Sequence, residues 1–176
     1  MDIIFRKAKE EDARGIVEVK LSSWLTTYKE LMPKEVLEKR KSTMEDRIPR
    51  TEEQIKEYNN IYVAVDNDRV VGTMSYGECR NEKYKEHGEL NFIYLLDEYQ
   101  GYGIGKKLFM IGIKELIDMG YNSMILNVLE GNKTIGFYEK YSGKKIEQKE
   151  EVFYNTPLIE NIMLFEDLNK IYSDNN

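Results

Sequence analysis

Three glycines at alternate positions constrain this chain more than any other segment of its sequence. They follow an apolar run, precede a helical pattern of apolar residues, and lie in the segment Gln100-Gly101-Tyr102-Gly103-Ile104-Gly105-Lys106. Glycine has no Cβ, so the backbone can bend tightly there and approach a ligand closely. The first N–H groups of a helix have no partner within the helix and carry partial positive charge. The segment therefore predicts a phosphate-binding turn between a strand and a helix.

The remaining patterns predict a single domain over residues 1–176, with a core over 3–166 and a polar, frayed tail at 172–176. Pro49 is expected to break the chain before a short helix that opens at Thr51. The other expected helices cover 9–28, 33–41, 104–119 and 131–141, and the expected strands cover 3–8, 61–65, 70–76, 90–96, 123–129, 145–153 and 158–165. This order predicts an α+β (three-layer α/β) fold, with a mixed, mostly antiparallel sheet of six to seven strands flanked by helices.

Charge and composition limit the partners and the compartment. The net charge is −6, which disfavours binding to nucleic acid. No apolar run approaches the roughly 20 residues that cross a bilayer, and the acidic N-terminus does not resemble a secretory signal. The single cysteine, Cys79, permits no internal disulfide. We therefore expect a cytoplasmic protein without nucleic-acid or membrane partners. The oligomeric state stays open between a monomer and a homodimer.

Two common phosphate-binding loops do not fit the glycine segment. A Walker loop ends in Gly-Lys-Ser/Thr, but Lys107 follows Lys106 here and Gln100 replaces the first glycine. A dinucleotide fingerprint needs a third glycine where Lys106 stands, and an acidic residue about 20 residues later, which this chain lacks.

The remaining pattern, Gln-x-x-Gly-x-Gly, resembles the pyrophosphate loop of the GNAT superfamily, the acetyl-CoA-dependent N-acetyltransferases. The segment 93–100 is similar to the fourth strand of that family, and 126–140 to its fifth strand and next helix. The resemblance implies a GNAT-like fold, acetyl-CoA as co-substrate, no metal, and an acceptor that is a small-molecule amine or a peptide amine. The stretch from Trp24 to Pro33 resembles a bacterial small-molecule or polyamine-type subgroup.

The same resemblance implies the residues that bind the coenzyme. The loop N–H groups would hold the pyrophosphate, the preceding strand would pair with pantetheine, and the N–H near Leu95 would polarise the thioester carbonyl. Asn132 lies one residue closer to Tyr138 than the family pattern requires, so it either contacts pantetheine or caps a helix. The implied set is Ile93, Tyr94, Leu95, Gln100, Gly101, Tyr102, Gly103, Ile104, Gly105, Lys106 and Asn132.

Attack of an amine on a thioester requires both a base and an acid. An alkylamine has a pKa near ~10.4 and must lose a proton, and the leaving thiolate, with a pKa near ~8.5, must gain one. By resemblance, the acid is Tyr138, in the run Phe137-Tyr138-Glu139-Lys140. Glu89 is the candidate base, and a water relay is the alternative.

Two further points stay open at the level of sequence. The acceptor is expected to meet the first helices and last strands, where aromatic and acidic residues suit an amine with an apolar stem, such as a polyamine. The residues concerned are Trp24, Tyr28, Glu30, Phe153 and Tyr154. The alternative to an enzyme is a non-catalytic acyl-CoA-binding or regulatory module, which keeps the loop and lacks the acid–base chemistry.

Overall fold

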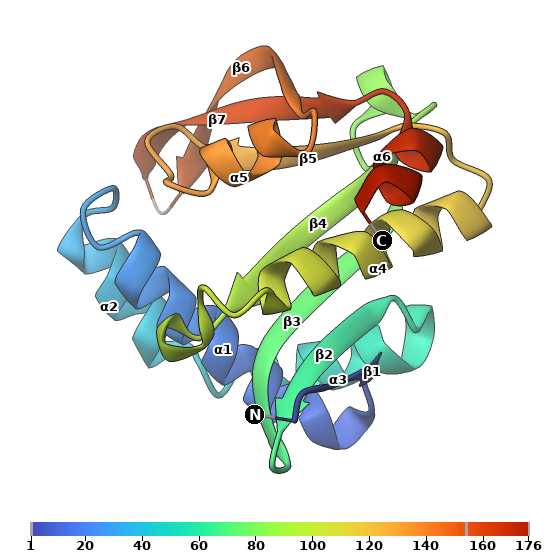
Figure 1. Ribbon diagram of the computed structural model, residues 1–176. Coiled ribbons are helices and arrows are strands. Elements are labelled where there is room, and N and C mark those ends of the chain that lie inside the picture. The colour runs from blue at the N-terminus through green and yellow to red at the C-terminus, as the bar shows by residue number, and fades with distance from the viewer. Residues whose placement is uncertain (1, 154, 176) are drawn as a thin grey trace. The chain divides into compact units, whose positions relative to one another are not determined.

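The computed structural model describes residues 2–153 and 155–175, so Tyr154 lies outside the described residues. Its strands form a seven-stranded sheet in the order β1-β2-β3-β4-β5-β7-β6 (Figure 1). The pairs β1–β2, β2–β3, β5–β7 and β6–β7 are antiparallel and β4–β5 is parallel, which confirms the predicted mixed, mostly antiparallel sheet. The strands are β1 (Ile4–Lys7), β2 (Ile61–Asp66), β3 (Arg69–Glu78), β4 (Gly88–Leu95), β5 (Met124–Leu129), β6 (Lys144–Phe153) and β7 (Thr156–Phe165).

Six α-helices accompany this sheet in the described part of the chain. They are α1 (Ala13–Thr27), α2 (Lys34–Ser42), α3 (Arg47–Tyr58), α4 (Ile104–Asp118), α5 (Ile135–Lys140) and α6 (Leu168–Asn175). Three single 3₁₀ turns are η1 (Glu10–Asp12), η2 (Glu82–Tyr84) and η3 (Asp97–Tyr99).

The fold divides into two compact units, each made of separate segments. The first unit contains the chain up to Ser75 and Phe92–Phe109, and the second contains Tyr76–Asn91 and the chain from Met110 onward. The chain therefore passes from one unit to the other within β3, β4 and α4. The single domain stays a prediction, and each unit is described below by itself.

The first unit is built on the β2–β3 hairpin and the helices α1, α2 and α3. Asn67 and Asp68 at the hairpin turn both have positive φ, 46° and 64°, as a two-residue type I′ turn requires. Val63, Val71 and Ile16 are fully buried, because alternate strand residues and one face of α1 share this core. Helix α1 packs against α2 and α3.

The expected break at Pro49 is wrong. Helix α3 starts at Arg47, so Pro49 is its third residue and Thr51 lies inside it, where its Oγ1 donates to the Arg47 carbonyl at 2.9 Å. The first N–H groups of a helix have no partner within it, so proline removes no helical hydrogen bond at this position. Asn59, with a φ of 46°, ends the helix.

The second unit is built on β5, β7 and β6, which lie side by side in Figure 1. Helix α5 ends in a Schellman motif: Ser142 has a φ of 68°, and the Gly143 N–H donates to the Tyr138 carbonyl at 2.9 Å. A Cβ on Gly143 would lie 2.7 Å from Phe165 Cζ, so close packing requires glycine there.

The prediction of a frayed tail at 172–176 is wrong for residues 172–175, because α6 continues to Asn175. Leu168 and Ile171 are buried, so the core extends beyond residue 166. These two apolar residues, three positions apart, lie on one face of the helix. Asp167 Oδ1 also accepts a hydrogen bond from the Lys170 N–H at 2.9 Å, which holds the first turn.

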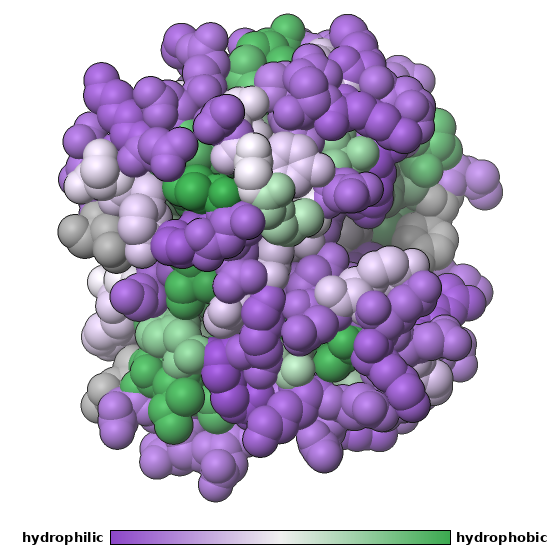
Figure 2. Space-filling model, turned by 90° about the vertical axis from the view of Figure 1, so that its right-hand side faces the viewer, coloured by the Kyte–Doolittle hydropathy of each residue, from purple (hydrophilic) through white to green (hydrophobic). Residues whose placement is uncertain are grey.

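Across residues 2–153 and 155–175, no helix combines the length and apolarity needed to span a membrane. Figure 2 shows mainly hydrophilic residues on the face turned to the viewer, with smaller hydrophobic groups between them.

Candidate functional site

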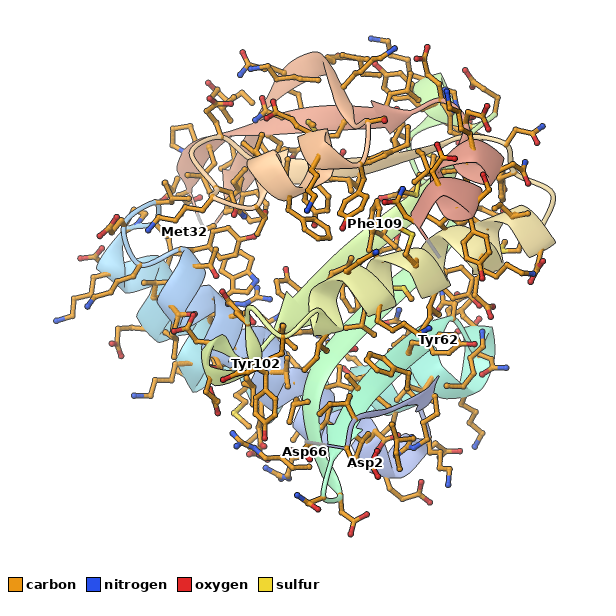
Figure 3. The ribbon with its side chains drawn as sticks, viewed as in Figure 1. Asp2, Met32, Tyr62, Asp66, Tyr102 and Phe109 are labelled. Carbon is orange, nitrogen blue, oxygen red and sulfur yellow. The ribbon has the colours of Figure 1, made fainter. Side chains whose placement is uncertain are left out.

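The glycine loop lies in the first unit, directly before α4. Gly101 and Gly103 have φ values of 81° and 80°, a left-handed conformation that other residues adopt only with strain. Tyr102 stands between them with 68% of its surface exposed, and Figure 3 places it on this loop. The conformation of the loop therefore explains two of its three glycines.

Gly105 needs another explanation. It lies in the first turn of α4 and is not among the positive-φ glycines. A Cβ added to Gly105 would have no heavy atom within 4 Å. Neither backbone strain nor crowding by the protein therefore requires glycine at this position. Open space beside the first N–H groups of a helix is what a bound phosphate needs.

Two side-chain contacts hold the segment that leads into the loop. The Tyr99 hydroxyl donates to Asp66 Oδ2 at 3.0 Å, and this hydrogen bond raises the pKa of Tyr99. Arg69 and Glu98 form an ion pair at 3.3 Å. Asp66 and Arg69 flank the β2–β3 turn, so the hairpin fixes the approach to the glycines.

The C-terminal half of β4 is positioned by α1. Ser23 Oγ donates to the Leu95 carbonyl at 3.1 Å, and Trp24 Nε1 donates to the Tyr94 hydroxyl at 3.1 Å. Phe92 and Tyr94 stack with ring centroids 5.5 Å apart, as alternate residues on one face of a strand can do. The segment expected to pair with pantetheine, Ile93 to Leu95, is thus held in place from its α1 side.

Glu89 lies in the second unit and is bound closely by Arg80. Its side chain is only 5% exposed. Its carboxylate accepts hydrogen bonds from the Arg80 backbone N–H (2.9 Å), Nε (3.3 Å) and Nη2 (2.6 Å). The hydrogen bond with Glu89 raises the pKa of Arg80. A carboxylate offers about four acceptor sites, so Arg80 occupies most of them. Sequence reasoning missed this partner.

Tyr138 and Asn132 also belong to the second unit. Tyr138 is half-buried on α5 and packs edge-on against Phe137 and Phe165, at centroid distances of 5.4 and 6.4 Å. Asn132 is buried, and its Oδ1 accepts from both the N–H and the hydroxyl of Thr134 at 2.9 Å. Its carbonyl oxygen thus stabilises the turn before α5, whose N-cap residue is Thr134, and contact of Asn132 with the coenzyme stays a prediction.

A cavity of about 160 Å³ in the first unit was not expected from the sequence. Among its lining residues are four cationic side chains, Lys20, Arg40, Arg47 and Arg50, and we call it the basic cavity. Arg47, Arg50, Thr51 and Gln54 line it from α3 at helical spacing, so they share one face of that helix. That spacing is the one pattern in the sequence that points to the cavity.

Comparison with known proteins identifies the class. Residues 21–143 match the Acetyltransferase (GNAT) family. The chain is also 35% identical over 146 residues to the uncharacterized N-acetyltransferase YuaI of Bacillus subtilis (strain 168), a match that covers 82% of each chain. The chain therefore belongs to the GNAT family of acetyltransferases, which confirms the family predicted from the sequence.

Solved structures have the same fold. The PaiA N-acetyltransferase of Thermoplasma acidophilum, in complex with coenzyme A, superposes with a TM-score of 0.66 at 23% identity, covering 92% of this chain and 98% of the other. The structure of YncA from Salmonella typhimurium with its cofactor acetyl-CoA gives a TM-score of 0.69 at 20% identity, covering 96% of this chain and 95% of the other.

Proposed function

We propose that this protein is a cytoplasmic N-acetyltransferase that moves an acetyl group from acetyl-CoA to a primary amine by direct attack in a ternary complex. The observation that carries the proposal is the glycine loop of a GNAT family member, with open space beside Gly105 at the start of α4. Relatives of the same fold hold coenzyme A or acetyl-CoA, which supports acetyl-CoA as the co-substrate.

In this proposal the first unit binds the coenzyme. Backbone N–H groups of Gly101, Gly103 and Gly105 hold the pyrophosphate, with Gln100 and Lys106 at its edges. The segment Ile93 to Leu95 pairs with the pantetheine amides. Acetyl-CoA supplies the activated acetyl thioester, and the Leu95 N–H stabilises the negative charge that develops on its carbonyl oxygen.

In the proposed reaction the acetyl group passes directly from sulfur to the amine. The amine lone pair attacks the thioester carbonyl carbon, the C–S bond breaks, and the electron pair leaves with sulfur. Tyr138, a neutral phenol at pH 7, donates its proton to the departing thiolate. The hydrogen-bond pattern of Glu89 bears on the base: since Arg80 occupies most acceptor sites of its carboxylate, we favour a water relay that removes the proton from the amine.

Release of free thiol tests the proposal. Purified protein with acetyl-CoA and a panel of amines, amino acids and peptides should release coenzyme A thiol with at least one acceptor. Tight calorimetric binding of acetyl-CoA without turnover on any acceptor would instead support the non-catalytic acyl-CoA-binding or regulatory module.

A further inference from the structure

The basic cavity lies where α1, α2 and α3 of the first unit meet. Lys20 comes from α1, Arg40 from α2, and Arg47 and Arg50 from α3. The apolar part of the lining consists of Val17 and Leu21 of α1 and Met44. In a chain of net charge −6, this cavity collects four basic side chains from three helices.

Two of the four cations are not neutralised by carboxylates of the described residues. Neither Lys20 nor Arg50 forms an ion pair with a carboxylate in the described parts of the chain. Burial, together with the neighbouring charges of Arg40 and Arg47, lowers the pKa of Lys20 to about 7. Like charges gathered in a partly buried place cost free energy, and an anion placed among them removes that cost.

The cavity is connected to β4 through two aromatic contacts. Lys20 Nζ lies 3.7 Å from the centroid of the Phe92 ring. The Arg40 guanidinium lies 3.6 Å from the Trp24 ring, and Trp24 Nε1 in turn donates to the Tyr94 hydroxyl. The cations are therefore one side chain away from the strand segment that, in the proposed function, holds the thioester.

We propose that the basic cavity binds an anionic group of the acceptor, a carboxylate or a phosphate, so that the substrate is an amine carrying negative charge. This inference rests on the proposed function. At about 160 Å³ the cavity is smaller than the roughly 300–1,000 Å³ of pockets that enclose a whole ligand, so it takes one end of the acceptor. Arginine forks match the planar geometry of carboxylate and phosphate. The inferred class differs from the polyamine expected from the sequence, because a polycation would be repelled here.

Trp24 provides a test that needs no acetyl-CoA. It is the only tryptophan of the chain and lies in contact with Arg40. Sodium acetate and inorganic phosphate are titrated separately at constant ionic strength, with chloride as the balancing anion, and Trp24 emission is followed. We expect a saturable change with at least one of them, and the arm that saturates distinguishes carboxylate from phosphate.

Variants decide whether the cavity is responsible. Arg50→Gln and Lys20→Gln should each weaken anion binding by about tenfold, since each removes a charged hydrogen-bond donor. Lys56→Gln, an exposed cation on the same helix α3 outside the cavity, is the matched control and should bind like the parent. Circular dichroism and melting confirm that each variant is folded. No saturable response, or equal affinity in all three variants, overturns the proposal.

Paired acceptors test the substrate class. An amino acid is compared with its amide, and phosphoethanolamine with ethanolamine, by thiol release. We expect kcat/KM at least about tenfold higher for one anionic member, with the preference reduced in Arg50→Gln. Equal turnover of both members in both pairs overturns this inference and leaves the proposed function intact. Absence of turnover with every amine contradicts the proposed function, while the Trp24 titration still decides whether the cavity binds anions.

Discussion

The two compact units use their polar groups in opposite ways. In the second unit, Glu89 is surrounded by donors from Arg80, and the Asn132 carbonyl oxygen is taken up by Thr134. In the first unit, Gly105 faces open space and Lys20 is surrounded by further cations. Burial of a polar residue therefore does not by itself indicate a ligand site. What matters is whether other groups of the protein already hydrogen-bond to that residue or neutralise its charge.

Lys20 and Glu89 show the difference between the two units most clearly. Each is a charged side chain taken partly out of water, which costs free energy unless the charge is compensated. Glu89 is compensated by a guanidinium that binds both of its oxygens, so its geometry is that of a structural ion pair. Lys20 has Arg40 and Arg47 as its neighbouring charges, so an external anion is the partner it lacks.

Removal of the Tyr138 hydroxyl should reduce turnover more than any other substitution considered for this protein. Tyr138→Phe keeps the ring packing against Phe165 and removes only the proton donor. We expect kcat to fall by about a hundredfold, within the range of general acid catalysis, with little change in acetyl-CoA affinity. Steady-state kinetics and calorimetry measure the two quantities, and Tyr172→Phe in α6 is the control. Loss of coenzyme affinity with unchanged kcat would contradict the proposed role.

Replacing Glu89 tests whether the comparison between the units holds. Glu89→Gln removes the negative charge beside Arg80, and we expect the free energy of unfolding to fall by about 1–3 kcal/mol. The kcat should change by less than about tenfold if water relays the proton. Chemical denaturation and turnover are measured together. A hundredfold loss of kcat at unchanged stability would identify Glu89 as the base and contradict its assignment to a purely structural ion pair.

Gly105 tests the open space of the first unit. Gly105→Ala should retain or slightly raise stability, by up to about 1 kcal/mol, because a helical glycine is replaced without a clash. The added methyl group should weaken acetyl-CoA binding by about tenfold, since it occupies the space proposed for the pyrophosphate. Gly136→Ala in α5, where a Cβ is equally unhindered, is the matched control and should bind acetyl-CoA normally. Equal affinity of the two variants would leave Gly105 unexplained.

Anion binding should also depend weakly on pH. Lys20, with a pKa of about 7, is mostly charged at pH 6 and mostly neutral at pH 8, so acetate should bind several-fold tighter at pH 6. The folded pKa lies below the unfolded value near ~10.4, so the unfolded chain binds more protons between pH 7 and 10, and stability from this group rises with pH across that window. Lys20→Gln should flatten both curves, and an unchanged pH profile of acetate binding would count against the role of Lys20.

Much of the fold follows from local patterns. The expected strands at 61–65 and 70–76 are confirmed as β2 and β3, and the expected helix at 104–119 as α4. The expected strands at 145–153 and 158–165 are confirmed as β6 and β7. Two expectations failed at helix ends. Pro49 is tolerated because it lies in a first turn, and α6 forms because Leu168 and Ile171 find a buried place, which depends on the rest of the fold.

The glycine loop, the strand before it, the helix after it and the family all follow from the amino-acid sequence alone. Turn chemistry and hydrophobic spacing are local, because they act through φ, ψ and the side-chain period of a few neighbouring residues. The ion pair of Arg80 with Glu89 and the lining of one cavity by Lys20, Arg40 and Arg50 depend on tertiary packing. Lys20, Arg40 and Arg50 meet because separate helices pack together, and Arg80 reaches Glu89 from the segment between β3 and β4. The charge that surrounds a side chain depends on what packing brings next to it.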